Sequence, residues 1–224
     1  MSAKIKINWL TLAGGFAPQT YTMVDLSTYI KEWKEYFPDV SGLPWEIVSD
    51  IQAIVTQTIS KVDDQYEIRD GAAIHRSAIL EEGVILKGPI LISPGCFVGA
   101  HAYLRGGVFL GHGTSVGPGC EVKSSFILRH SALAHFNFVG DSIVGSDVNL
   151  EAGAVVANHY NERKIKTIDV IAGGKRMPTG VVKFGSVIGD HTRVGANAVL
   201  SPGTILNRRS VVGRLALVDQ IGNQ

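Results

Sequence analysis

Two cations and a histidine near the middle of the chain could do chemistry. Arg105 and Lys123 lie 18 residues apart, so a backbone that turns once every 18 residues would stack them on one edge. Stacked cations with little acid nearby suit an anionic group such as a phosphate, although they are equally consistent with solvated surface charges. His135 lies 12 residues beyond Lys123, at a different edge. We therefore expect a complete site to form near a subunit boundary.

A six-residue repeat predicts how these side chains are presented. The first run of aliphatic residues is Ile74, Leu80, Leu86, Ile92, Val98, Leu104, Leu110, Val116, Val122 and Leu128, and a second runs from Ile188 to Val212. This period is the signature of a parallel β-helix, in which three hexads close a triangular coil of about 18 residues. The aliphatic side chains point into the bore, and glycines lie at the corners. We predict an all-β fold, a left-handed parallel β-helix, over residues 71–224.

Residues 1–70 carry a helical pattern instead. Asp25 is a candidate N-cap for a helix that reaches Phe37, and Pro44 opens a second helix that reaches Ile59. We expect this N-terminal helical cap region to be a lid over the first coil and a subunit contact. A partner-binding or substrate-gating element is the alternative.

The repeat is interrupted twice. Its register slips between Leu128 and Val144, and it is lost from Val156 until Ile188. The second gap is polar and basic, which predicts a loop insertion near residues 157–185. Loops that leave a rigid scaffold often carry function.

The composition limits the class of protein. Lys and Arg number 21 against 20 Asp and Glu, which argues against a nucleic-acid-binding surface or an electrostatic membrane anchor. No apolar run is long enough to span a bilayer, and the N-terminus lacks the pattern of a signal peptide. Cys96 and Cys120 are interpreted as small core residues in a reducing compartment. We expect a cytoplasmic protein with no nucleic-acid partner.

Residues 96–160 resemble the acetyltransferase domain of the bifunctional N-acetylglucosamine-1-phosphate uridylyltransferase/glucosamine-1-phosphate acetyltransferases. The segments that carry the resemblance are 103–107, 121–123, 134–141, 148–153, 158–160 and 164–167. Residues 173–190 are similar to the archaeal-type sugar-1-phosphate nucleotidylyl/acetyltransferases. Since the chain has no counterpart of their nucleotidylyltransferase domain, we expect a stand-alone acyltransferase.

The resemblance implies a homotrimeric enzyme that moves an acetyl group from acetyl-CoA to an amino sugar, either glucosamine-1-phosphate-like or nucleotide-linked. It assigns His135 as the catalytic base, Glu121 as an acid that could orient the imidazole, and the Ala152 N–H as the donor to the thioester carbonyl. The implied acceptor ligands are Arg105, Lys123, Phe138, Asn149, Asn158 and Lys164. The implied CoA contacts are Ala196, Asn197, Gly213 and Arg214. Further candidates for the CoA phosphates are Lys175, Arg176, Arg208 and Arg209.

Two positions depart from the family pattern. Phe138 stands where a tyrosine hydroxyl is usual near the sugar phosphate. Glu151 stands where a glycine is usual, beside the implied oxyanion donor. Both departures favour a different amino sugar as acceptor, such as a nucleotide-linked one.

Three other interpretations stay open. An acyl-carrier-protein-dependent sugar-nucleotide acyltransferase of the lipid A type shares the fold and an Ala-His motif, and a non-catalytic β-helix scaffold is also compatible. His130 and His135 have the spacing of two zinc ligands in γ-class carbonic anhydrases. However, Pro94 occupies the region of the third ligand, and His112 should stack on His130 within one subunit, so we expect no metal.

Overall fold

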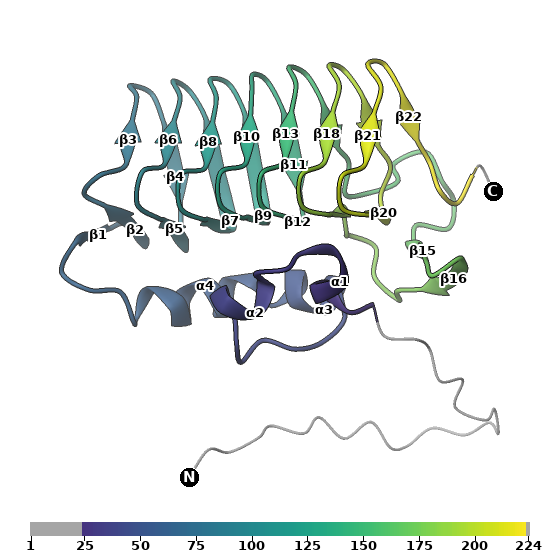
Figure 1. Ribbon diagram of the computed structural model, residues 1–224, viewed down its shortest axis with the longest axis horizontal. Helices are drawn as coiled ribbons and strands as arrows, with labels where there is room; N and C mark the ends of the chain where they lie inside the picture. The colour runs from purple at the N-terminus through teal and green to yellow at the C-terminus, as the bar shows by residue number, and fades with distance from the viewer. Residues whose placement is uncertain (1–23, 223–224) are drawn as a thin grey trace, which may run out of the picture.

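Successive hexads form short parallel strands that stack into a β-helix with three faces (Figure 1). The computed structural model describes residues 24–222. The strands of faces 1 and 3 belong to one 13-stranded sheet because two long strands, β7 and β9, turn the corner between these faces. The strands of face 2 form a separate 7-stranded sheet. The predicted fold class, a parallel β-helix preceded by a small helical region, is confirmed.

Each coil contributes one strand to each face. Face 1 consists of β2 (Ala72–His75), β5 (Ile90–Ile92), the second halves of β7 (Tyr103–Leu110) and β9 (Glu121–Ile127), β12 (Ile143–Val144), β17 (Ser186–Ile188) and β20 (Thr204–Leu206). Face 2 consists of β3 (Ile79–Leu80), β6 (Phe97–Val98), β8 (Ser115–Val116), β10 (Ala132–Leu133), β13 (Asn149–Leu150), β18 (Arg193–Val194) and β21 (Val211–Val212). Face 3 consists of β4 (Ile85–Lys87), the first halves of β7 and β9, β11 (Phe138–Gly140), β14 (Val155–Val156), β19 (Val199–Leu200) and β22 (Leu217–Val218).

The aliphatic residues of the repeat fill the bore, with one exception. Val116 and Val122 are buried in the core of the coils, as predicted, but Ile127 takes the place expected for Leu128. Leu128 belongs instead to the cluster outside face 1. The cause is a β-bulge, because Gly106 and Gly107 in β7 lie opposite a single residue in β9. The register therefore slips one strand earlier than the sequence suggested.

The two predicted helices are each divided in two. The helical segments are α1 (Leu26–Tyr29), α2 (Trp33–Tyr36), α3 (Pro44–Ser49) and α4 (Ile51–Ile59). Asp25 caps α1 as predicted, because its carboxylate accepts a hydrogen bond from the Ser27 N–H at 3.0 Å. The first helix breaks where Ile30 adopts an extended conformation, which lets the buried Trp33 turn toward the sheet.

The helices lie along face 1, not over the first coil, so the predicted position of the lid is wrong (Figure 1). The reason is an apolar stripe on the outside of face 1, which includes Phe109 and Phe126 and packs against Trp33. The approach is close: a Cβ on Gly107 would lie 2.9 Å from Ile51, and the φ of Gly107 is +94°. Only glycine fits both demands.

A short strand covers the open edge of the first coil, and an insertion interrupts the β-helix between its later coils. β1 (Tyr66–Arg69) pairs antiparallel with β2 and so occupies the first strand edge of face 1. The insertion predicted near 157–185 is the segment between β14 and β17, and it carries the hairpin of β15 (Asp169–Ala172) and β16 (Lys175–Pro178).

Both cysteines are free and buried, as the sequence suggested. Burial raises the pKa of the Cys96 thiol to about 11, so this thiol is a packing residue. Within residues 24–222, no helix is long and apolar enough to cross a membrane.

The contact between the helices and face 1 predicts a large effect on stability. Phe126→Ala should lower the free energy of unfolding by about 3–5 kcal/mol, because it removes a fully buried ring that packs against Trp33 and Phe37. Ile68→Ala, at a side chain that is 59% exposed, is the matched control and should change it by less than about 0.5 kcal/mol. Urea denaturation measures both. Similar losses for the two variants would contradict the packing assigned to face 1.

Candidate active site

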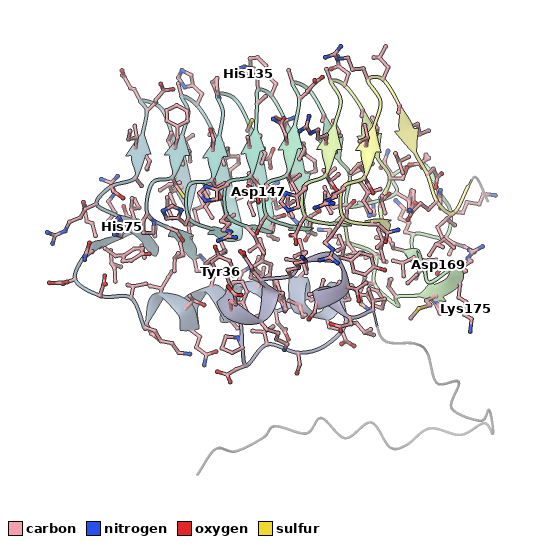
Figure 2. The ribbon with its side chains drawn as sticks, viewed as in Figure 1. Tyr36, His75, His135, Asp147, Asp169 and Lys175 are labelled. Atoms are coloured by element: carbon pink, nitrogen blue, oxygen red, sulfur yellow. The ribbon has the colours of Figure 1, made fainter. Side chains whose placement is uncertain are left out.

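Four of the predicted residues form one column at the corner between faces 2 and 3. The Gly153 N–H donates to the His135 carbonyl at 2.8 Å, the Asn197 N–H to the Ala152 carbonyl at 3.0 Å, and the Leu215 N–H to the Ala196 carbonyl at 3.0 Å. His135, Ala152, Ala196 and Arg214 therefore occupy equivalent positions on four successive coils, which stack about 4.8 Å apart. Figure 2 shows His135 on the rim of the β-helix farthest from the helices.

The corner conformation explains the residue types that follow the column. The next residue on each coil has a positive φ, as in Phe136 at 51° and Asn197 at 55°. At Gly153, whose φ is +72°, a Cβ would lie 2.2 Å from the side-chain oxygen of Asn197, so a larger residue would force that side chain to move. Asn137, which sequence reasoning missed, is buried and donates to the Glu151 carbonyl at 2.7 Å. This hydrogen bond links the corner that carries His135 to the next coil.

The histidine and the backbone donor are both available. The His135 side chain is exposed and has no hydrogen-bond partner within residues 24–222. The Ala152 N–H likewise donates to no acceptor in the described part of the chain. An imidazole that can take a proton and an unengaged N–H that can stabilise an oxyanion lie one coil apart.

On the next coil, the N–H that corresponds to that of Ala152 belongs to Ala196, and it donates to the Glu151 side chain. Its carboxylate accepts the Ala196 N–H at 2.9 Å and binds the Arg214 guanidinium through two hydrogen bonds of 2.8 and 3.0 Å. Arg214, followed by the Ala196 N–H, holds the pKa of the Glu151 carboxyl below its ordinary value of 4.5. The negative charge of Glu151, which departs from the family pattern, is thus balanced by Arg214, a residue that the resemblance implies to bind CoA.

On face 3, Arg105 and Lys123 are register partners on neighbouring strands, as the spacing predicted. The expectation of little local acid is wrong, however. Arg105 contacts the Glu121 carboxylate at 2.7 Å, so Glu121 pairs with this cation and not with His135. Sequence spacing could not show the pair because Glu121 lies two residues before the register partner of Arg105.

Lys123 has an acidic partner as well. Its ammonium lies 2.5 Å from a carboxylate oxygen of Asp141, which also accepts a hydrogen bond from Asn158. Phe138, on the neighbouring strand, offers an aromatic edge and no hydroxyl. A Cβ on Gly140 would meet both Asn158 and the Phe138 ring at 2.8 Å. Face 3 therefore carries a tightly packed and nearly neutral cluster.

The remaining predicted residues lie elsewhere in the chain. Asn149 is exposed on β13 of face 2, and Lys164 is exposed in the insertion without a hydrogen bond or ion pair to the described residues. Asn149 and Gly213 line a groove of about 630 Å³ along face 2 together with Glu151 and Arg214. The groove adds residues that sequence reasoning missed, namely Asp147 and Arg193. Arg193 is the register partner of Asn149 although 44 residues separate them, because the insertion lies between their strands.

The additional candidates for CoA phosphates are dispersed. Lys175 and Arg176 lie on β16, where Arg176 pairs with Asp169 at 2.6 Å. Arg208 and Arg209 lie at the corner between faces 1 and 2, whereas Arg214 lies at the corner between faces 2 and 3. In one chain these residues do not form a single cluster.

The histidines of the metal alternative are also placed by the structure. His112 and His130 stack within one chain, with ring centroids 5.2 Å apart, as their spacing predicted. Among residues 24–222, no group of three or more His, Cys, Asp or Glu side chains is placed to hold a metal ion.

The repeat, the three faces and the corner column define a hexapeptide-repeat β-helix protein. The family model for the GMPPB C-terminal domain matches residues 86–221, which is more than half of the 224 residues. The chain belongs to this family.

Curated relatives extend the comparison. The bifunctional sugar-1-phosphate nucleotidylyltransferase/acetyltransferase of Sulfurisphaera tokodaii is 34% identical over 179 residues, which cover 77% of this chain and 43% of that protein. The bifunctional protein GlmU of Methanococcus vannielii is 32% identical over 195 residues, which cover 84% of this chain and 46% of that protein. The chain therefore spans less than half the length of these relatives.

A solved structure also matches part of the chain. The GDP-perosamine N-acetyl transferase from Caulobacter crescentus, crystallised with CoA and GDP-perosamine, shares 18% identity over 65% of this chain and 51% of that chain. Its TM-score of 0.25 is too low to support an argument.

The Glu151–Arg214 contact predicts a measurable titration. In Arg214→Gln the pKa of the Glu151 carboxyl should rise toward 4.5, because the strongest stabilisation of the carboxylate is lost. NMR of the carboxyl carbon measures the midpoint, and Arg193→Gln, which removes another cation of the same groove, is the control. An unchanged midpoint in Arg214→Gln would show that the two side chains do not pair in solution.

Proposed function

We propose that the chain transfers an acetyl group from acetyl-CoA to the amine of an amino sugar. The observation that carries this proposal is the corner column, in which the exposed His135 imidazole lies one coil from the unengaged Ala152 N–H. The names of the curated relatives, which include acetyltransferase activity, support the same chemistry. Acetyl-CoA serves as a co-substrate, and the proposal needs no metal.

Each step of the transfer has a residue at the corner. The amine lone pair attacks the thioester carbonyl carbon, and His135 takes the proton from the attacking nitrogen. The Ala152 N–H stabilises the oxyanion of the tetrahedral intermediate. The C–S bond then breaks, and His135 returns the proton to the departing CoA sulfur. No covalent enzyme intermediate is required, consistent with the burial of both cysteines.

The corner column also suggests the path that a bound CoA would follow along the β-helix. Ala196 and Arg214 follow Ala152 on the next two coils, so an extended pantetheine arm could run along the corner from the thioester toward Arg214. CoA would compete with Glu151 for the Ala196 N–H and for the guanidinium. This competition costs little because water screens an ion pair that is exposed to solvent.

The nearly neutral cluster on face 3 bears on the acceptor. Since Arg105 and Lys123 are each paired with a carboxylate, a sugar-1-phosphate would have to compete with Glu121 and Asp141. Phe138 offers no hydroxyl in compensation. We therefore favour a nucleotide-linked amino sugar, whose phosphates extend beyond the sugar ring, over glucosamine-1-phosphate. In this arrangement Glu121 positions Arg105.

The predicted homotrimer and cytoplasmic location are part of the proposal. Helices cover face 1, whereas faces 2 and 3 expose apolar side chains, including Val211 at 78% and Leu217 at 68%. Three copies that pack through these faces would cover them and bring Asn149 of one chain toward face 3 of the next. Sedimentation equilibrium tests this: a mass of three chains of 24.0 kDa is expected, and a monomer would contradict it.

A thiol-release assay with acetyl-CoA tests the catalytic assignment. His135→Ala should lower kcat by about 10²–10⁴-fold, because a general base contributes an effect of that size. The matched control is His101→Ala, at an exposed histidine of the same corner on an earlier coil, which should retain full activity. The acceptor panel contains amino-sugar phosphates and nucleotide-linked amino sugars, and the latter should give the higher kcat/KM.

The same assay discriminates the alternatives. Turnover only with a long-chain acyl carrier protein as donor would favour the lipid A type of transferase. Equal rates for His135→Ala and the unmodified chain would remove the catalytic role of His135 and favour a scaffold.

A further inference from the structure

A second pocket lies across face 2 from the corner column. It has a volume of about 460 Å³ and forms where the segment around α1 meets the corner between faces 1 and 2. Its lining residues are Thr28, Lys31, Asp190, His191, Asn207, Arg208 and Arg209. None of them belongs to the catalytic column.

The pocket concentrates positive charge in a chain whose formal net charge is +1. Lys31, Arg208 and Arg209 are exposed, and none of the three side chains forms an ion pair or hydrogen bond with residues 24–222. The Thr28 hydroxyl and the Asn207 amide are equally unengaged within the described segment. The pocket therefore offers three cations and two neutral donors to a ligand.

The one carboxylate in the pocket is already engaged. Asp190 is 4% exposed, and its two oxygens accept the Lys31 N–H and the Ser146 N–H, each at 2.9 Å. Its own N–H donates to the Tyr29 carbonyl at 3.0 Å. Asp190 thus fastens the helical segment to the β-helix through backbone N–H groups, and its carboxylate forms no hydrogen bond with the Lys31 ammonium or with the guanidinium of Arg208 or Arg209 in the described part of the chain.

The histidine of the pocket faces a different acid. The His191 Nδ1 lies 3.6 Å from the Asp147 carboxylate, at the border with the groove of face 2. Arg209 follows His191 by one coil at the same corner, where both residues have a φ near +60°. Arg208 and Arg209 thus line the pocket from the stacked coils, and Lys31 lines it from the helical segment.

We propose that this pocket binds a phosphate-bearing small molecule, through its phosphate or diphosphate group. Guanidinium groups match phosphate oxygens in pairs, and clustered cations without partners favour an anion of high charge. The volume is in the range of small-molecule sites. The proposal does not depend on the acetyl-transfer chemistry, because the pocket lies at another corner of the coil.

A ligand here would contact both parts of the chain. Lys31 comes from the helical region, whereas Arg208 and Arg209 come from the β-helix. Binding would therefore tie the helical region to the coils and raise the unfolding temperature.

Isothermal titration of the full chain with pyrophosphate, and separately with inorganic phosphate, tests the proposal. Saturable binding should be weakened about 30-fold or more in Arg208→Gln/Arg209→Gln and about 10-fold in Lys31→Gln, because charged hydrogen bonds are lost. The matched control is Lys61→Gln/Arg76→Gln, which removes two exposed cations far from the pocket and should bind normally. Unchanged unfolding temperatures without ligand verify that the variants fold.

A parallel titration with CoA separates the pocket from the acetyl donor. Affinity for CoA should stay within about twofold in Arg208→Gln/Arg209→Gln. The proposal is overturned if pyrophosphate does not bind saturably, or if the control variant loses binding equally. It is also overturned if the affinity for CoA falls in parallel, since the arginines would then belong to the CoA site.

Discussion

Backbone hydrogen bonding between successive coils is the constraint on which the rest of the molecule depends. Each coil donates to the next in parallel register, so residues far apart in sequence are held about 4.8 Å apart in one column. His135, Ala152, Ala196 and Arg214 owe their alignment to this rule and not to contacts between their side chains. A rigid array of this kind suits catalysis because its groups are positioned before the substrate arrives.

The helical region gives the three faces different roles. By covering the aromatic stripe of face 1, it leaves faces 2 and 3, and the corner between them, free for ligands and neighbouring chains. The same docking creates the cationic pocket, because Asp190 must bind the backbone at Lys31 to hold the segment in place. The corner column and the cationic pocket therefore lie at opposite borders of face 2.

The sequence predicts the coils of the fold well, but it predicts the side-chain contacts around the corner column and on face 3 less well. The hexads specify the coils because each bore admits one aliphatic side chain per face. The exchange of Ile127 for Leu128 could not be predicted, since it depends on a bulge in the neighbouring strand. The pairing of Glu151 with Arg214 was hidden by the insertion, which separates residues that fold two coils apart. The partners of Arg105 and Lys123 depend on side-chain directions, about which spacing carries no information.

The central claim is that the corner column binds the thioester beside His135. A crystal structure with bound CoA tests it most directly. The account predicts the sulfur within about 4 Å of the Ala152 nitrogen, because the carbonyl oxygen of an acetyl thioester at that place would lie about 3 Å from the N–H, with the pantetheine arm extending along the corner past Ala196 toward Arg214. Density for CoA at the corner between faces 1 and 2, or a sulfur on a face remote from the His135 ring of every neighbouring chain, would contradict the account.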